Sequence, residues 1–410
     1  MHFAELAERC ISRCRIIAGF SETSGITRTF LSDPMHACHR AFSGWMEELG
    51  MQVRVDAIGN LRGLYGGGRN RRRLLMGSHL DTVPGAGAYD GVLGVCIALA
   101  VIDAVRTMDL PFDIEVLAFS EEEGVRFRTP FLGSLAAIGR FDPALLNLQD
   151  SNGRTIRDAI MHFGLDPARL GEAQIDGRAF AYLEFHIEQG PVLEDARERI
   201  AAVEAIAGQS RLELTFKGRA SHAGTTPMHL RRDALSAAAE WITHVERSAR
   251  DTDGLVATVG RLQVVPGTGN VVPGEVRAGL DVRHSCDEIR IPAVSEICSA
   301  AEQIASRRGL TVAIDETLNQ SAVTMDEHLL KLMERAILRT TGVARRITSG
   351  AGHDAMIMAE KVPSAMMFIR SIGGISHHPD ESVYLEDVEE AIRAGALFLS
   401  DLAEQGKRTA

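Results

Sequence analysis

The fold is decided by residues 73–124, RLLMGSHLDTVPGAGAYDGVLGVCIALAVIDAVRTMDLPFDIEVLAFSEEEG. An apolar run ends at Ser78, a glycine-rich loop follows, and residues 91–107 have the apolar pattern of a buried helix. Residues 112–118 then indicate a second buried strand. A strand, loop, helix and strand in this order are typical of mostly parallel α/β sheets, whose ligands bind at the carboxyl ends of the strands. We therefore expect chemistry in the loops after Met76 and Phe119.

The rest of the chain predicts a second domain. A chain of 410 residues exceeds the size at which a single hydrophobic core usually stops growing. From about residue 209 to residue 325 the expected order of elements is βαββαβ, which is that of a ferredoxin-like split sandwich. We therefore predict an inserted domain over residues 209–326, within a first domain formed by residues 1–208 and 327–410.

Composition and charge narrow the functional classes. There are 44 Lys and Arg against 55 Asp and Glu, and the net charge of −11 has the wrong sign for a binder of nucleic acid or anionic membranes. No stretch approaches the roughly 18 apolar residues of a membrane span, and the N-terminal residues lack the layout of a secretion signal. The six scattered cysteines indicate reduced thiols. We expect a cytoplasmic enzyme or binding protein that acts on small molecules.

The loop after the first strand carries one half of a possible metal site. His79 and Asp81 are two residues apart on an extended segment, and Asp90 stands where the helix begins, so an imidazole and a carboxylate can converge. We expect Asp81 to accept the proton of the other ring nitrogen of His79, which would orient the ring. The alternative is purely structural, with His79 capping a turn and Asp90 capping the helix.

The loop after the second strand contains Glu121, Glu122 and Glu123. Acidic residues at a helix start are stabilising without any metal, and this remains the simpler alternative. Three adjacent carboxylates at the ligand-binding edge of a sheet nevertheless repel one another unless a cation or a proton relieves them. Such crowding suits a metal ligand beside a general base that takes a proton from water and passes it to a leaving nitrogen.

Two further histidines end apolar segments beside glycine and proline. His186 lies in EFHIEQGP, residues 184–191, and His377 lies in GGISHHP, residues 373–379. A single histidine of this kind is usually structural. Four clusters in one chain instead favour a metal centre.

Together these motifs resemble those of the zinc-dependent hydantoinase/carbamoylase amidases, which are related to di-metal aminoacylases and carboxypeptidases. The resemblance implies an α/β fold: a mixed, mostly parallel catalytic sheet of the zinc aminopeptidase/carboxypeptidase type, with an inserted ferredoxin-like dimerisation domain. It runs almost end to end, through GSHLDTV (77–83), YDGVLGV (89–95), EEEGVRF (121–127), HIEQGPVLE (186–194), ASHAGTTPM (220–228), GNVVPGE (269–275), SGAGHDA (349–355) and GISHHP (374–379).

The resemblance also implies two divalent metal ions, either zinc or manganese or cobalt, because the ligands are oxygen and nitrogen atoms without thiolate. Glu122 would be the general base, assisted by Asp81. The implied ligands are His79, Asp90 and His186 for one metal, and Asp90, Glu123 and His377 for the other.

Further positions are implied for the substrate. His222 would stabilise the oxyanion and reach the site from a partner subunit, which implies a homodimer through the inserted domain. Asn270 and Arg283 would hold a carboxylate of the substrate, and Gln189 and His353 would line the site. Arg283 could instead pair with a neighbouring acid.

The family acts on ureido groups of small carboxylic acids, and residues 83–94 most resemble the bacterial allantoate amidohydrolases. N-carbamoyl-L-amino acid hydrolase and β-ureidopropionase are alternatives. Small residues are expected after Arg126 and Phe127, but residues 128–131 are RTPF. The substrate could differ if this segment lines the pocket. A dipeptidase or aminoacylase on the same scaffold is a further alternative. A non-catalytic binding protein with this fold would have lost a metal ligand or the general base, yet every expected ligand and Glu122 are present. A hydrolase with a Ser or Cys nucleophile is a further alternative, but no such motif is evident.

Overall fold

The computed structural model describes residues 3–68 and 71–409, so residues 1–2, 69–70 and 410 of the predicted first domain lie outside the described part of the chain. The chain forms two compact units. The first contains the described residues up to Glu204, then Met325–Ile347, then those from Ala351 onward. The second contains Ala205–Thr324 and Thr348–Gly350.

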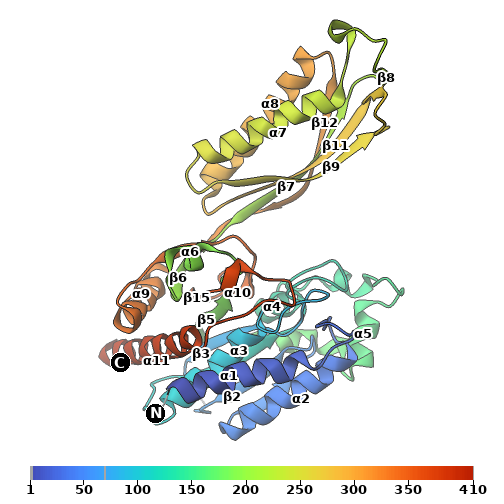
Figure 1. Ribbon diagram of the computed structural model, residues 1–410. Helices are drawn as coiled ribbons and strands as arrows, with labels where there is room; N and C mark the ends of the chain where they lie inside the picture. Colours follow the sequence, from blue (N-terminus) through green and yellow to red (C-terminus); the bar gives the residue numbers. More distant parts are fainter. Residues whose placement is uncertain (1–2, 69–70, 410) are drawn as a thin grey trace. The chain divides into compact units, whose positions relative to one another are not determined.

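Strands of the first unit form most of a sheet in the order β1-β2-β4-β3-β5-β15-β6-β13, with β14 also pairing with β6 (Figure 1). At its centre β3 is parallel to β4 and β5, and β5 is parallel to β15. The expected mixed, mostly parallel sheet is thus confirmed. The strands are β1 Gln52–Val55, β2 Leu61–Tyr65, β3 Arg73–His79, β4 Asp113–Phe119, β5 Ala179–Ile187, β6 Ile200–Ile206, β13 Val323–Thr324, β14 Arg346–Ser349 and β15 Ser364–Ile369.

Helix α3, Val92–Val105, is buried over almost its whole length and packs against β3 and β5. Gly94 permits this close approach, because a Cβ atom there would overlap the carbonyl oxygen of Phe185. The glycines of YDGVLGV therefore serve packing beside the site. The other helices of this unit are α1 Phe3–Ala18, α2 Asp33–Glu48, α4 Leu132–Ile138, α5 Ile156–His162, α6 Val192–Ala196, α9 Glu327–Thr341, α10 Asp354–Met358 and α11 Leu385–Thr409, with 3-10 turns η1 Pro143–Asn147, η2 Pro167–Ala173 and η4 Ile372–Gly374.

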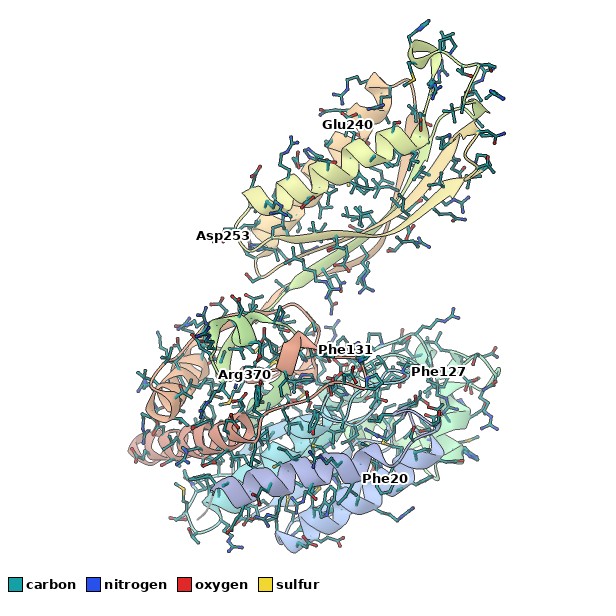
Figure 2. The ribbon with its side chains drawn as sticks, in the orientation of Figure 1. Phe20, Phe127, Phe131, Glu240, Asp253 and Arg370 are labelled. Carbon is teal, nitrogen blue, oxygen red and sulfur yellow. The ribbon has the colours of Figure 1, made fainter. Side chains whose placement is uncertain are left out.

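The second unit has an antiparallel sheet in the order β12-β7-β11-β9, and both of its long helices lie on one face of the sheet (Figure 1). Trp241 and Phe216 are buried between these layers. Glu240, which is labelled in Figure 2, forms ion pairs with Arg307 and Arg308 that join the two helices. The elements are β7 Gly208–Lys217, β8 Ser221–His222, η3 Met228–Leu230, α7 Ala234–Asp251, β9 Val256–Val265, β10 Val271–Val272, β11 Glu275–His284, α8 Asp287–Arg307 and β12 Thr311–Gln320.

Candidate metal centre

The candidate ligands of the first unit lie at the carboxyl ends of neighbouring parallel strands. His79 ends β3, His186 is near the end of β5, and Glu123 follows β4. Asp90 precedes α3, and His377 lies in the loop after β15. The topology of the sheet therefore gathers ligands that are up to 298 positions apart, from residue 79 to residue 377, at one edge.

The first group consists of His79, Asp90 and His186, all of which are buried. The Nε2 atoms of the two histidines are 3.3 Å apart. Oδ1 of Asp90 lies 3.2 Å from Nε2 of His186 and 3.9 Å from that of His79. Three potential ligand atoms thus converge on one point.

The second group consists of Asp90, Glu123 and His377. Nε2 of His377 lies 3.1 Å from Oδ2 of Asp90 and 3.4 Å from Oε1 of Glu123. The two carboxylate oxygens of Asp90 therefore face different groups, as a carboxylate that bridges two cations must.

The hydrogen bonds of the histidines fit a metal. Nδ1 of His79 lies 3.0 Å from the carbonyl oxygen of Asp81, and Nδ1 of His186 lies 2.9 Å from that of Ile187. Because a carbonyl only accepts, each Nδ1 carries a hydrogen, which leaves each Nε2 as the atom that a metal would bind. The two Nε2 atoms then face the Asp90 carboxylate, to which Gln189 Nε2 donates, and Oε1 of Glu123 is buried without a hydrogen-bond partner. A divalent cation would satisfy all of these atoms.

Charge at the site supports the same conclusion. Burial disfavours a charged imidazole at His79, but the nearby carboxylates of Asp81, Glu122 and Asp90 outweigh burial and raise its pKa well above the ordinary value. The site therefore calls for positive charge, which bound metal ions would supply.

Glu122 is buried beside both groups. Burial raises the pKa of its carboxyl well above the ordinary value, and the neighbouring carboxylate of Glu123 raises it further while His79 opposes the change. In this environment the carboxylate holds a proton more tightly than it would in water, which suits a general base that accepts a proton from water and returns it.

Asp81 holds the loop that carries Glu122. Its Oδ1 accepts the backbone N–H of Glu122 at 3.0 Å, and its Oδ2 accepts that of Glu123 at 3.0 Å. Its carboxylate is 3.6 Å from Nδ1 of His79, whose closer acceptor is the Asp81 carbonyl. The role of the Asp81 carboxylate in orienting His79 stays a prediction: its side chain interacts with the ring, and the Asp81 carbonyl is the nearer acceptor.

Glu121 differs from its two neighbours. Its Oε2 accepts the N–H of Phe30 at 3.1 Å, and its Oε1 accepts that of Arg126 at 3.0 Å. Its backbone has φ +51°, a left-handed conformation that is uncommon for residues other than glycine. Glu121 therefore braces the loop, which leaves Glu122 and Glu123 for chemistry.

Gln189 and His353 also lie at the centre. The Nε2 of Gln189 is 3.1 Å from Oδ1 of Asp90 and 3.3 Å from Nε2 of His377. The ring of His353 is 4.4 Å from that of His186, centre to centre, and burial lowers its pKa well below the ordinary value. His353 is therefore a neutral imidazole.

His222, Asn270 and Arg283 belong to the second unit. His222 pairs with Val271 between β8 and β10, and the N–H of Ala223 donates to the carbonyl of Asn270 at 2.9 Å, so the first two are neighbours. The guanidinium of Arg283 donates to Asp281 from Nε at 2.8 Å and from Nη2 at 3.0 Å. The acid pairing that sequence reasoning left open is thus present, and Arg283 also donates to the carbonyl of Gly350 at 2.6 Å.

Sequence reasoning missed Glu381. Its Oε1 accepts the N–H of Asp90 at 3.0 Å, and its Oε2 accepts the hydroxyl of Ser376 at 3.0 Å. The only signal was an acid two residues after Pro379, which is too common to identify a site.

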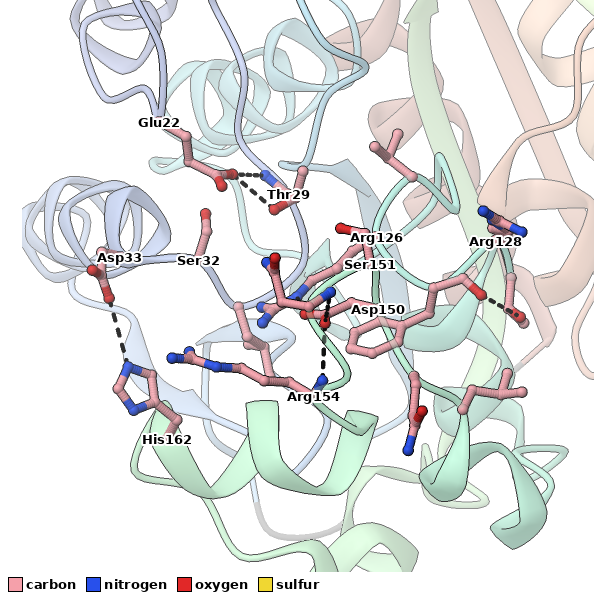
Figure 3. A pocket seen from close by; sticks show the side chains of 17 residues that line it. Glu22, Thr29, Ser32, Asp33, Arg126, Arg128, Asp150, Ser151, Arg154 and His162 are labelled. Carbon is pink, nitrogen blue, oxygen red and sulfur yellow. Dashed lines mark hydrogen bonds and ion pairs between the residues drawn. The ribbon is translucent and has the colours of Figure 1, made fainter.

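The unusual segment after Glu123 lines a pocket of about 970 Å³ to which the candidate ligands do not contribute (Figure 3). Arg128 and Thr129 line it, together with Arg126, which donates from Nε to Asp150 at 3.1 Å. Phe131 instead faces Gly352, where a Cβ atom would lie 2.9 Å from the ring (Figure 2). This segment therefore does not form one continuous wall of the metal centre.

Comparison with known proteins agrees with this geometry. The model of peptidase family M20/M25/M40 matches residues 75–401. A probable allantoate deiminase of Oryza sativa subsp. japonica is 36% identical over 97% of this chain and 89% of its own length. An N-carbamoyl-L-amino acid amidohydrolase of Geobacillus stearothermophilus is 38% identical over 93% of each chain. The crystal structure of a hydantoinase/carbamoylase family amidase from Burkholderia multivorans is similar with a TM-score of 0.91, at 32% identity, over 96% of this chain and 97% of that one.

Proposed function

Because this chain belongs to peptidase family M20/M25/M40, and its similar proteins include allantoate deiminase and carbamoylase, we propose that it is a metal-dependent amidohydrolase of ureido carboxylic acids. Its proposed reaction is the hydrolysis of allantoate with water to ureidoglycine, ammonia and carbon dioxide, a step in purine catabolism. The observation that carries the proposal is the sharing of Asp90 between two ligand groups beside the buried carboxyl of Glu122.

The proposed cofactors are two zinc ions, or manganese or cobalt in their place, held by the two groups. When bound, such ions polarise the ureido carbonyl and make water a stronger acid. Glu122 accepts the proton of the attacking water and returns it to the nitrogen that leaves as ammonia. Asp81 fixes the backbone from which Glu122 extends.

The residues of the second unit would bind the other end of the substrate. Arg283 and Asn270 would hold its carboxylate, and Asp281 would keep the guanidinium fork in place. Gln189 and His353 would contact the ureido group, and the exposed His222 would stabilise the oxyanion in the site of a partner subunit. We therefore propose a homodimer that assembles through the inserted domain.

An exposed strand edge supports the dimer. In the sheet of the second unit, β9 pairs only with β11 among the described strands, and its Val256, Leu262 and Val265 are 60%, 44% and 42% exposed. An apolar strand with an open edge invites pairing with another chain. A second copy of this chain would cover it.

The substrate is tested by ammonia release from chelated protein that is reconstituted with zinc or manganese. Fast release from allantoate, with little from a panel of N-carbamoyl-L-amino acids and β-ureidopropionate, supports the proposal. The reverse result supports a carbamoylase, which the 38% identity to the Geobacillus enzyme favours as the second candidate. No ammonia from any of these ureido compounds, with cleavage of dipeptides or N-acyl amino acids, would overturn the ureido assignment.

Among the described helices, none combines the length and the apolar composition that a membrane span requires.

A further inference from the structure

We propose that Glu381 is a positioning residue that builds the second metal site, formed by Asp90, Glu123 and His377. This inference deepens the proposed function and rests on it for the presence of two metals. Glu381 would not contact metal or substrate. It would act through the two loops that present the ligands.

The carboxylate of Glu381 joins these loops. It is 4% exposed, and its Oε1 accepts the N–H groups of Tyr89 at 2.9 Å and Asp90 at 3.0 Å. Its Oε2 accepts the hydroxyl of Ser376, the residue before His377, at 3.0 Å. One side chain thus links the backbone of the bridging ligand to the loop of the second histidine.

The loop of Asp90 is shaped to receive this side chain. A Cβ atom at Gly87 would overlap the Glu381 side chain, so the glycine makes room for the carboxylate. The amides of Tyr89 and Asp90 are in buried residues. Without Glu381 both amides would lose their acceptor, which is costly in a buried position.

The loop of His377 needs such a restraint. His377 has φ +55°, and Gly373 and Gly374 before it have φ +66° and +65°. A left-handed conformation is uncommon for residues other than glycine, and surrounding contacts help to hold it. The side chain of His377 is also 48% exposed, so burial contributes little to holding it.

The first metal site depends less on Glu381, because it shares Asp90 with the second site but has no ligand in the His377 loop. His79 and His186 extend from β3 and β5, which pair with each other within the sheet, and both side chains are almost fully buried. Loss of Glu381 should therefore weaken the second site more than the first. Substitution of a residue that holds a metal ligand in place typically lowers metal affinity by about 10- to 100-fold.

The test is direct measurement of zinc binding to the full-length protein, by calorimetric titration of the chelated protein and by metal content after gel filtration. Glu381→Ala should retain one zinc per chain and bind the second at least about tenfold more weakly. Glu381→Gln should restore two zinc ions, because its amide oxygen can accept the backbone N–H groups and its NH2 can donate to Ser376. Ser376→Ala removes the link to the His377 loop, together with the contact that Gln189 Nε2 donates to the same hydroxyl at 3.3 Å, and should weaken the second zinc as well.

Glu188→Ala is the matched control. Glu188 is 8% exposed and its carboxylate accepts the N–H groups of Val192 and Leu193, which belong to α6 and not to a ligand loop. It should bind two zinc ions. The proposal is overturned if Glu381→Ala binds both zinc ions as wild type does, or if it and Glu188→Ala lose zinc equally. Wild-type protein that binds two zinc ions but hydrolyses no ureido compound would refute the proposed function alone, since zinc binding is measured without substrate.

Discussion

The carboxylate of Asp81 holds the loop of Glu122 by accepting its backbone N–H at 3.0 Å, and it accepts the next amide, that of Glu123, at the same distance. A general base and a metal ligand are therefore placed by one buried side chain. Because the loop itself is irregular, this contact decides where the proton acceptor lies.

Asp81→Asn should lower kcat by about 10²-fold, because asparagine can accept only one of the two amides and a shift of about 1 Å in a catalytic group costs that much. The measurement is steady-state ammonia release at saturating metal. Asp103→Asn, on α3 beside Arg9, is the control and should retain wild-type kcat. A kcat within twofold of wild type in Asp81→Asn would show that the contact does not position the base.

Glu122→Gln should lower activity by about 10²–10⁴-fold, because the amide cannot accept a proton. Metal content should remain at two ions per chain, since Glu122 belongs to neither ligand group. Turnover near that of wild type would assign the base elsewhere.

Arg283→Ala should raise KM for the ureido acid by about 10- to 100-fold, because this is the affinity lost with one hydrogen bond to a charged group. Asp281→Ala should raise KM less, because it only frees the guanidinium that Asp281 holds. Arg277→Ala, on the same strand and paired with Glu275, is the matched control. An unchanged KM in Arg283→Ala would remove its carboxylate role.

His222→Ala and Glu122→Gln should each be nearly inactive alone, yet regain activity when the two proteins are unfolded and refolded together. In the mixed dimer one site has Glu122 from one subunit and His222 from the other, if His222 acts across the dimer. Refolding each variant by itself controls for recovery. No regain in a mixture that forms dimers would place His222 in its own subunit's site.

The stability of the protein should decrease as pH rises from about 4 to about 6, in part because of Asp56. Burial raises the pKa of Asp56 from 3.8 to about 6 in the folded state, although Arg62 and the amides of Asn60 oppose the change. Between these values the folded protein binds more protons than the unfolded chain, so unfolding becomes easier with increasing pH. Urea unfolding at several pH values should give a flatter profile for Asp56→Asn, and an identical slope in both proteins would contradict the prediction.

Much of the fold followed from local pattern. The apolar run before Ser78, the apolar helix after Asp90 and the strand before Ser120 predicted a mostly parallel sheet, and the structure confirms it. Helix limits were less accurate: the helix expected over residues 91–107 is α3, Val92–Val105. Helix ends depend on capping contacts, and local pattern specifies these weakly.

By itself, the sequence determined which residue types are available to bind metal ions. Histidines and carboxylates in four glycine-bounded clusters indicate metal ligands, because few other arrangements relieve so many lone pairs and negative charges at one edge of a sheet. Tertiary structure decided which atoms face one another. In the folded protein, Glu121 accepts the N–H of Phe30 and Asp81 accepts that of Glu122. Arg283 donates to Asp281, and Glu381 accepts the N–H of Asp90. These contacts join residues that sequence spacing does not relate, since a hydrogen bond requires proximity in space, and the packing of the whole chain sets that proximity.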